Sequence, residues 1–204
     1  MSERNPPHGY PSARHPLLRT IGRTMMRLGG WKVAGEIPPI PKFVLIVAPH
    51  TSNWDFIVGV FVKFALEVET HWFGKDSLFH GPLGAFMRMI GGRPVHRDSH
   101  EGVVAEVAAM FAAEDRFMLA LAPEGTRRRV DHWRTGFYHI ARAAGVPIVP
   151  VAFDWSRREV RILPTFQPTG DTDGDIARLQ ALYRPEMGYT PSNFVAAGAL
   201  EGQG

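Results

Sequence analysis

A histidine and an aspartate in the segment PHTSNWD, residues 49–55, have side chains suited to acid–base chemistry. A carboxylate such as that of Asp55 can hold one imidazole nitrogen of His50 and leave the other nitrogen free to remove a proton. The spacing alone is a weak signal, because His71 and Asp76 show it as well. His71, however, opens an expected strand and no hydroxyl-rich turn follows it. We therefore interpret His71 as structural and predict that His50 and Asp55 form a catalytic pair.

A second candidate site is the segment APEGTR, residues 122–127, which directly follows an apolar stretch. Gly125 lets the backbone approach a ligand closely, and Thr126 and Arg127 carry donors that suit phosphate oxygens. Glu124 offers an acceptor for a substrate hydroxyl or for an arginine. The alternative is an ordinary turn between a strand and a helix, followed by a solvated run of arginines. Taken alone, the segment favours that alternative.

Between these segments lies GGRPVHR, residues 91–97, in which Arg97 follows a short expected strand and offers another positive charge for a phosphate. A further segment, VPIVPV, occupies residues 146–151. Taken in order, these four segments resemble the sequence blocks of the glycerophosphate/lysophospholipid acyltransferase superfamily. The resemblance extends over about residues 44–154, and Ser52 stands where that family often has a serine.

The resemblance implies transfer of a fatty acyl group. In that reaction His50 removes the proton from an acceptor hydroxyl that attacks a thioester carbonyl, and Asp55 fixes the imidazole. The implied donor is acyl-CoA or acyl-carrier protein. The implied acceptor is lysophosphatidic acid, which would become phosphatidic acid, or another lysolipid; no cofactor and no metal are implied. Arg97 and Arg127 would hold the acceptor phosphate and Glu124 its glycerol part. The predicted substrate-binding residues are Arg97, Glu124, Gly125, Thr126, Arg127 and Ser52.

Three continuous apolar stretches, residues 43–48, 117–122 and 147–153, predict strands that are buried on both faces. Helical patterns separate them, which favours an α/β fold with a largely parallel mixed sheet flanked by helices. The two candidate sites then lie at the carboxyl edge of the sheet, where ligands bind in such folds. We expect helices over residues 17–28, 54–66, 82–90, 99–113, 136–144 and 173–182, and further strands over 70–74, 94–96 and 159–163.

Residues 17–28 predict a short N-terminal amphipathic helix, with apolar residues on an arc of about 100° and arginines opposite. Its length of about 18 Å is too short to cross a bilayer. Two interpretations stay open: contact with a membrane surface, or packing on the helix's own domain. We divide the chain into a tail with this helix (1–32), an acyltransferase domain (33–190) and a C-terminal tail (191–204).

The composition is that of a globular protein, with 204 residues, 45% of them apolar and 21% charged. The lack of cysteine excludes disulfides and thiol catalysis. No stretch reaches the roughly 20 unbroken apolar residues of a membrane-spanning helix. The first 14 residues lack the apolar block of a secretory signal. We therefore expect a cytoplasmic protein, peripheral on the cytoplasmic face of the membrane.

Other function classes are weaker hypotheses. No HExxH motif supports a metal-dependent hydrolase, and no GxSxG motif surrounds Ser52 as a hydrolase nucleophile. A nucleic-acid role is disfavoured, because the arginine run at 127–129 is short and the net charge is only +3. A non-catalytic lipid-binding module would have no need of His50 and Asp55.

Overall fold

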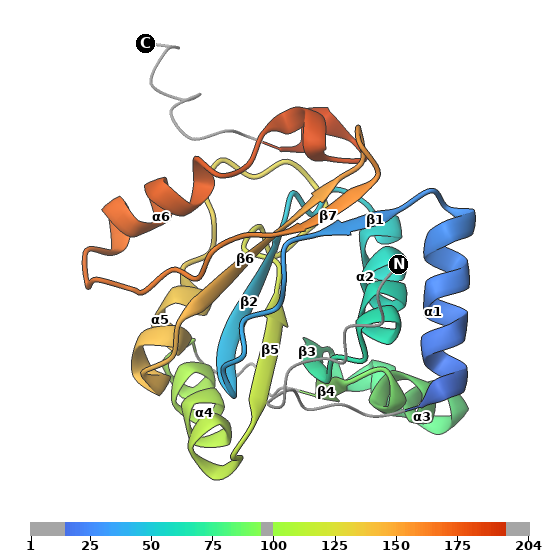
Figure 1. Ribbon diagram of the computed structural model, residues 1–204. Coiled ribbons are helices and arrows are strands. Elements are labelled where there is room, and N and C mark those ends of the chain that lie inside the picture. The colour runs from blue at the N-terminus through green and yellow to red at the C-terminus, as the bar shows by residue number, and fades with distance from the viewer. Residues whose placement is uncertain (1–14, 95–99, 195–204) are drawn as a thin grey trace.

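The computed structural model describes residues 15–94 and 100–194, apart from the side chains of residues 100 and 101. Within this part of the chain, one seven-stranded sheet has the order β1-β7-β6-β2-β5-β3-β4, and helices cover both of its faces (Figure 1). Every neighbouring pair runs parallel except β6 and β7. The predicted fold class is confirmed. The strands are β1 (Lys32–Ala34), β2 (Lys42–Ala48), β3 (Thr70–Gly74), β4 (Gly92–Pro94), β5 (Phe117–Leu121), β6 (Ile148–Asp154) and β7 (Glu159–Ile162).

The helices agree with the predicted ranges to within two residues at each end. They are α1 (Pro16–Leu28), α2 (Asn53–Leu66), α3 (Gly81–Met89), α4 (His100–Ala113), α5 (Gly136–Ala144) and α6 (Thr172–Gln180), with 3-10 turns η1 (Asp76–Phe79), η2 (Pro185–Met187) and η3 (Pro191–Asn193). Strand β1 was not predicted, because a three-residue strand is too short to show a pattern. The strand predicted over 94–96 begins earlier, as β4, and residues 95 and 96 lie outside the described residues.

The central strand β2 shows why the sheet is buried on both faces. Val44, Ile46 and Ala48 belong to a core cluster with residues of α4 and α5. Phe43 and Leu45 point the other way, into a second cluster that includes residues of α2. Because successive side chains of a strand point to opposite faces, a strand covered on both sides must be apolar throughout.

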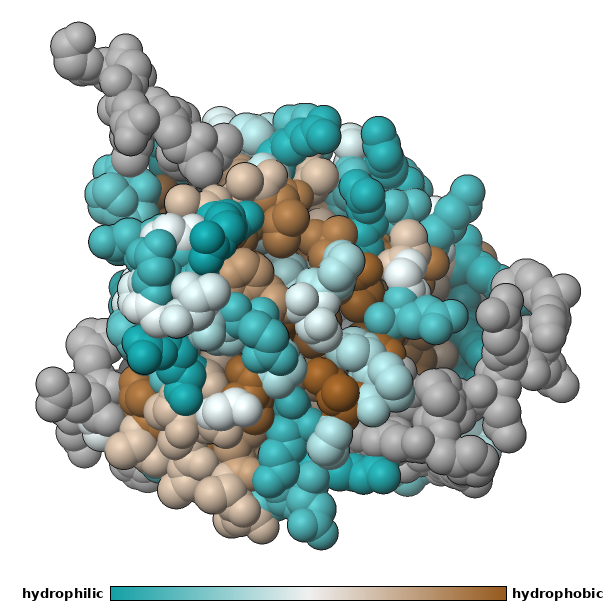
Figure 2. Space-filling model, turned by 60° about the vertical axis from the view of Figure 1, so that its left-hand side comes forward, coloured by the Kyte–Doolittle hydropathy of each residue, from teal (hydrophilic) through white to brown (hydrophobic). Residues whose placement is uncertain are grey.

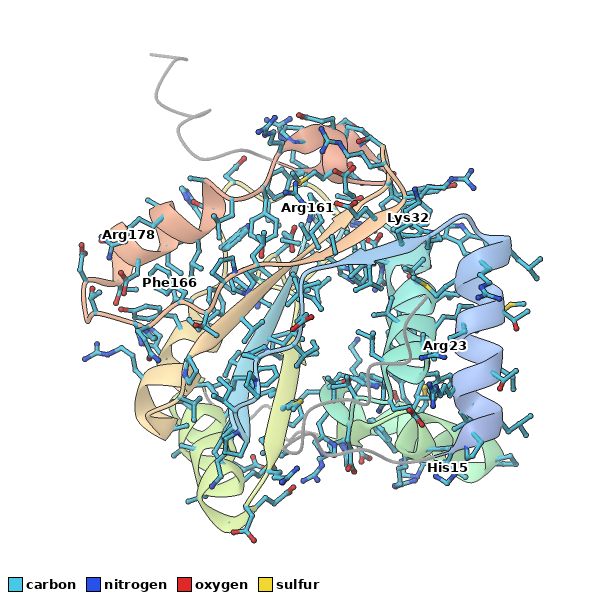
Figure 3. All side chains as sticks on the ribbon, in the orientation of Figure 1. His15, Arg23, Lys32, Arg161, Phe166 and Arg178 are labelled. Atoms are coloured by element: carbon cyan, nitrogen blue, oxygen red, sulfur yellow. The ribbon has the colours of Figure 1, made fainter. Side chains whose placement is uncertain are left out.

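Helix α6 is fastened to α5 by the buried side chain of Asp175. Its Oδ2 accepts hydrogen bonds from the Tyr138 hydroxyl at 2.7 Å and the Thr169 N–H at 2.6 Å. Burial raises the pKa of Asp175, but these donors and Arg178 outweigh it and lower the pKa to about 2. Arg178 also lies over the ring of Phe166 (Figure 3). The flank with α4, α5 and α6 mixes hydrophilic and apolar residues at its surface (Figure 2).

Helix α1 lies on the outer side of α2 (Figure 1) and contacts it at Gly22; the buried residues of α1 are Gly22 and Met26. A Cβ on Gly22 would lie 2.5 Å from the backbone nitrogen of Ala65, so the two helices approach each other closely there. Most of the predicted apolar arc is left outside this contact. The exposed apolar residues of α1 are Leu17, Ile21, Met25 and Leu28. None of the described helices is long and apolar enough to span a bilayer.

Candidate active site

His50 follows β2 at the carboxyl edge of the sheet, and Asp55 lies in the first turn of α2. The Nδ1 atom of His50 is 3.3 Å from Oδ2 of Asp55. The Asp55 side chain is fully buried, whereas that of His50 is 18% exposed. With Nδ1 directed at the carboxylate, Nε2 is the ring nitrogen left for a substrate. The structure therefore brings the predicted pair together and keeps the imidazole accessible.

The turn between β2 and α2 holds the Asp55 carboxylate in place. Its Oδ2 accepts from the backbone N–H groups of Thr51 and Ser52, both at 2.8 Å. The Ser52 hydroxyl in turn accepts from the N–H of Trp54 at 3.2 Å and caps α2. These bonds satisfy backbone donors at the start of the helix. The role of Ser52 in the structure is thus to cap α2, and a contact between Ser52 and a substrate stays a prediction.

The other carboxylate oxygen of Asp55 is held by a residue that the sequence did not indicate. Its Oδ1 accepts from the indole Nε1 of Trp155 at 2.7 Å. Trp155 directly follows β6, which is hydrogen-bonded to β2 in the sheet. The two residues stand 100 positions apart in the chain. One signal in the sequence could have indicated Trp155, because it directly follows a buried strand.

Glu124 follows β5, the other neighbour of β2. Its Oε1 accepts from the backbone N–H of His50 at 2.9 Å, so this carboxyl group supports the loop that carries the histidine. Glu124 is buried, and burial raises the pKa of its carboxyl, against the lowering effect of the His50 N–H. Its Oε2 has no hydrogen-bond partner among the described residues. The predicted contact with a glycerol group stays a prediction.

The rest of the second predicted site forms an exposed turn. Gly125 has a φ of +65°, and a Cβ there would lie 2.6 Å from the side chain of Arg134, which covers the turn. The Thr126 hydroxyl accepts from a backbone N–H two residues later. Arg127 is exposed and lines the same cavity as His50. Arg97 lies outside the described residues, so its place beside Arg127 stays a prediction.

A cavity of about 660 Å³ lies beside His50, between α2 and the sheet. Sites for small-molecule ligands commonly have volumes of about 300–1,000 Å³. The cavity is lined along the length of α2, from Asn53 to Leu66. It therefore suits a long apolar ligand whose reactive end lies at His50. Its apolar lining includes Leu45, Val47, Phe56, Ile57, Val60, Ala120, Leu121, Val151 and Phe153.

Lys63 lines the cavity near the other end of α2. Its Nζ donates to the carbonyl oxygens of Thr70 at 2.9 Å and Ile90 at 2.8 Å. Burial lowers the pKa of this ammonium group to about 8, against the raising effect of Glu69. Lys63 is ten residues beyond Asn53, or about 15 Å along the helix. It is therefore a polar group in the cavity wall at a distance from the His50 end of the cavity.

The second histidine with an aspartate five positions later has a different environment. His71 lies in β3, and its ring stacks on that of Phe117, with centroids 5.0 Å apart. Its Nδ1 accepts from Nε of Arg93 at 3.3 Å. Burial, followed by the charge of Arg93, lowers the pKa of His71. These contacts agree with the structural interpretation of His71.

Comparison with known proteins identifies similar sequences and a similar fold. A model of the acyltransferase family matches residues 33–154. The chain is 26% identical over 162 residues to the 1-acyl-sn-glycerol-3-phosphate acyltransferase of Haemophilus influenzae, which covers 74% of this chain and 65% of that protein. It is 29% identical over 174 residues to the enzyme of the same name from Escherichia coli, with coverages of 79% and 66%. The chain thus spans just under two thirds of the length of these curated relatives.

A solved structure supports the fold. The 1-acyl-sn-glycerophosphate (LPA) acyltransferase PlsC from Thermotoga maritima superposes with a TM-score of 0.58 at 16% sequence identity. The match covers 82% of this chain and 78% of that one. At this identity the likeness concerns the arrangement of helices and strands.

Proposed function

Because the chain belongs to the acyltransferase family, we propose that it transfers a fatty acyl group from a thioester to the hydroxyl of a lysophospholipid. The preferred acceptor is lysophosphatidic acid, which becomes phosphatidic acid, in keeping with the names of the relatives. The observation that carries the proposal is the His50–Asp55 pair beside a long apolar cavity. A base next to a site for an alkyl chain meets the two main requirements of this reaction.

His50 acts as the general base in the proposed mechanism. Its Nε2 takes the proton of the acceptor hydroxyl while the hydroxyl oxygen forms a bond to the thioester carbonyl carbon. Asp55 holds Nδ1 and stabilises the imidazolium that results. The carbon–sulfur bond then breaks, and the leaving thiolate takes the proton from Nε2. No acyl-enzyme forms, because the acceptor hydroxyl is itself the nucleophile.

The apolar cavity receives the acyl chain, with the thioester carbonyl at His50. The distance of about 15 Å along α2 from Asn53 to Lys63 is close to half of the bilayer's hydrocarbon thickness of about 30 Å. One leaflet of a membrane has that depth, so the cavity accommodates chains of the length found in membrane lipids. Acyl-CoA and acyl-carrier protein present the same thioester, and both are donors under this proposal.

Arg127 binds the acceptor phosphate in the proposed complex, because its exposed side chain lines the cavity that His50 lines. We expect Arg127→Ala to raise the KM for lysophosphatidic acid about tenfold or more, since a hydrogen bond to a charged group is lost. The KM for the thioester should change much less. Initial rates with each substrate varied in turn measure both values, and Arg128→Ala is the control. Equal effects of Arg127→Ala on the two KM values would contradict this role.

A panel of acceptors with radiolabelled acyl-CoA, separated by chromatography, tests the proposed function. We expect the label in phosphatidic acid when lysophosphatidic acid is supplied. Transfer of the label to a different lysolipid would support the proposed acyl transfer but show that the acceptor is not lysophosphatidic acid. If folded protein bound a fatty acyl chain but consumed no thioester with any acceptor, the chain would be a non-catalytic lipid-binding module.

We further propose that α1 rests on the cytoplasmic face of a membrane, where the acceptor lipids lie. Leu17 and Leu28 are 71% and 75% exposed, and Ile21 and Met25 continue the same stripe. Arg23 and Arg27 are exposed on the opposite part of the helix, and an apolar face opposed by arginines is the pattern of a helix lying in the interface between acyl chains and headgroups. Packing of α1 on α2 uses a different side of the helix.

The double variant Leu17→Glu with Leu28→Glu tests this contact. We expect its co-sedimentation with phosphatidylglycerol-containing vesicles to fall about tenfold or more, because two leucines no longer enter the apolar layer. Leu182→Glu is the matched control, since Leu182 is 40% exposed but lies after α6. Unchanged binding of the double variant would mean that α1 is a surface helix of its own domain.

A further inference from the structure

The three adjacent central strands β6, β2 and β5 all end at the candidate active site. His50 follows β2, Glu124 follows β5 and Trp155 follows β6. Glu124 contacts the backbone of His50, whereas Trp155 contacts the side chain of Asp55. From this geometry we infer that Trp155 is a positioning residue that holds Asp55 in the orientation His50 requires. The inference rests on the proposed function.

The two oxygens of Asp55 have different partners. Oδ2 accepts from the N–H groups of Thr51 and Ser52 and faces the ring of His50. Oδ1 accepts from the indole of Trp155. The torsion that turns an aspartate carboxylate has a broad, soft preference, so donors on one oxygen alone restrain it weakly. A donor on Oδ1 from another strand opposes that rotation and keeps Oδ2 directed at Nδ1 of His50.

Trp155 is itself held from several sides. Its backbone N–H donates to the carbonyl oxygen of Met187 at 2.9 Å. Its ring meets those of Trp31 and Tyr189 edge to face, with centroids 4.7 Å away in both cases. Partners with fixed rotamers are what keep a catalytic group within a narrow range of geometries. The indole therefore restrains Asp55 as a rigid donor.

The segment after α6, which contacts Trp155 through Met187 and Tyr189, also donates hydrogen bonds to the loops after β2 and β5. The N–H of Thr190 donates to the Thr51 hydroxyl at 3.1 Å, and the side-chain amide of Asn193 donates to the carbonyl oxygen of Arg127 at 3.0 Å. Both contacts come from residues beyond the range 33–154 that the family model matches. The frame around Asp55 thus includes a part of the chain outside that range.

Two isosteric replacements of Trp155 separate its hydrogen bond from its shape. In 3-benzothienylalanine a sulfur replaces the indole N–H, whereas 7-azatryptophan keeps the N–H on a ring of the same size. We expect the benzothienyl protein to lose about 10- to 100-fold in kcat, because a small displacement of a catalytic group has effects of that size. The KM of each substrate should stay within about twofold. The azatryptophan protein should have a kcat close to that of the unmodified chain.

The outcomes distinguish this inference from the proposed function. Normal kcat in the benzothienyl protein, equal losses with both analogues, or a change confined to KM would overturn the role of Trp155. Absence of acyl transfer by the unmodified protein would instead contradict the proposed function.

Hydrogen exchange measured by NMR tests the role of Trp155 without any turnover. The indole N–H of Trp155 should exchange slowly with solvent, and Asp55→Ala should speed that exchange. Equal exchange in both proteins would overturn the inference. Trp54→Phe, which replaces an indole that is 53% exposed, is the control in both assays.

Discussion

Replacement of His50 by alanine is expected to lower kcat for acyl transfer by at least about 10²-fold, the lower end of general-base catalysis. The variant removes Nε2, the ring nitrogen that takes the proton of the acceptor hydroxyl in the proposed mechanism, while Asp55 keeps its bonds to Thr51, Ser52 and Trp155. The loop should also keep its conformation, because Glu124 contacts the backbone N–H at position 50. Single-turnover release of the thiol measures the chemical step directly.

His80→Ala is the matched control for this prediction. Nε2 of His80 is 3.1 Å from Oδ2 of Asp76, but the His80 side chain is 74% exposed. This pair is therefore also a histidine beside an aspartate, but on the surface of the protein and not in a buried site. We expect the control to retain its rate. Near-normal acyl transfer by a folded His50→Ala protein would remove the histidine from the mechanism, while leaving the fold and family membership of the chain untouched.

Filling the cavity at Gly59 should change which acyl chains the protein accepts. Gly59 and Phe153 both line the cavity, and a Cβ on Gly59 would lie 3.5 Å from the Phe153 ring. Gly59 is about 9 Å along α2 from Asn53, so a phenylalanine there blocks the part of the cavity towards Lys63. A chain that loses contact for about four methylenes loses about 3 kcal/mol, or about 100-fold in kcat/KM.

Competition between palmitoyl-CoA and octanoyl-CoA measures this preference. Gly59→Phe should lower kcat/KM for palmitoyl-CoA about 100-fold relative to octanoyl-CoA, since the shorter chain ends before the obstruction. Gly59→Ala should leave the ratio nearly unchanged, because its added methyl group makes an ordinary van der Waals contact. An equal loss for both thioesters would indicate that the acyl chain takes another path.

The catalytic loop could be predicted from the sequence because its signals are local. His50 and Glu124 each follow a continuous apolar stretch, and in a parallel sheet the carboxyl ends of such strands meet at one edge. The hydroxyl-rich turn before Asp55 predicts a helix start, which brings the carboxylate back towards the histidine. The strands and helices that carry these residues formed as expected, since their patterns depend on burial of both sheet faces.

The partners of these residues depended on strand order, which hydrophobic patterns do not encode. Trp155 reaches Asp55 because β6 is paired with β2. A contact between residues 100 positions apart cannot be predicted from local sequence spacing. For Ser52 and Glu124, sequence motifs indicated the residues but not their partners, which are backbone groups of the same site. Arg97 lies outside the described residues, and its role in phosphate binding remains a prediction.

For the amphipathic helix and for the cavity, too, the sequence determined one part and the tertiary structure determined the other. Periodicity alone determined that residues 17–28 form a helix with an apolar stripe, because 3.6 residues per turn place those side chains together. Only the tertiary structure decided that Gly22 faces α2 and Met26 is buried while Leu17 and Leu28 stay exposed. Apolar strands determined that the sheet is covered on both faces. The open space between α2 and the sheet depends on where the tertiary structure places that helix, which no stretch of sequence specifies by itself.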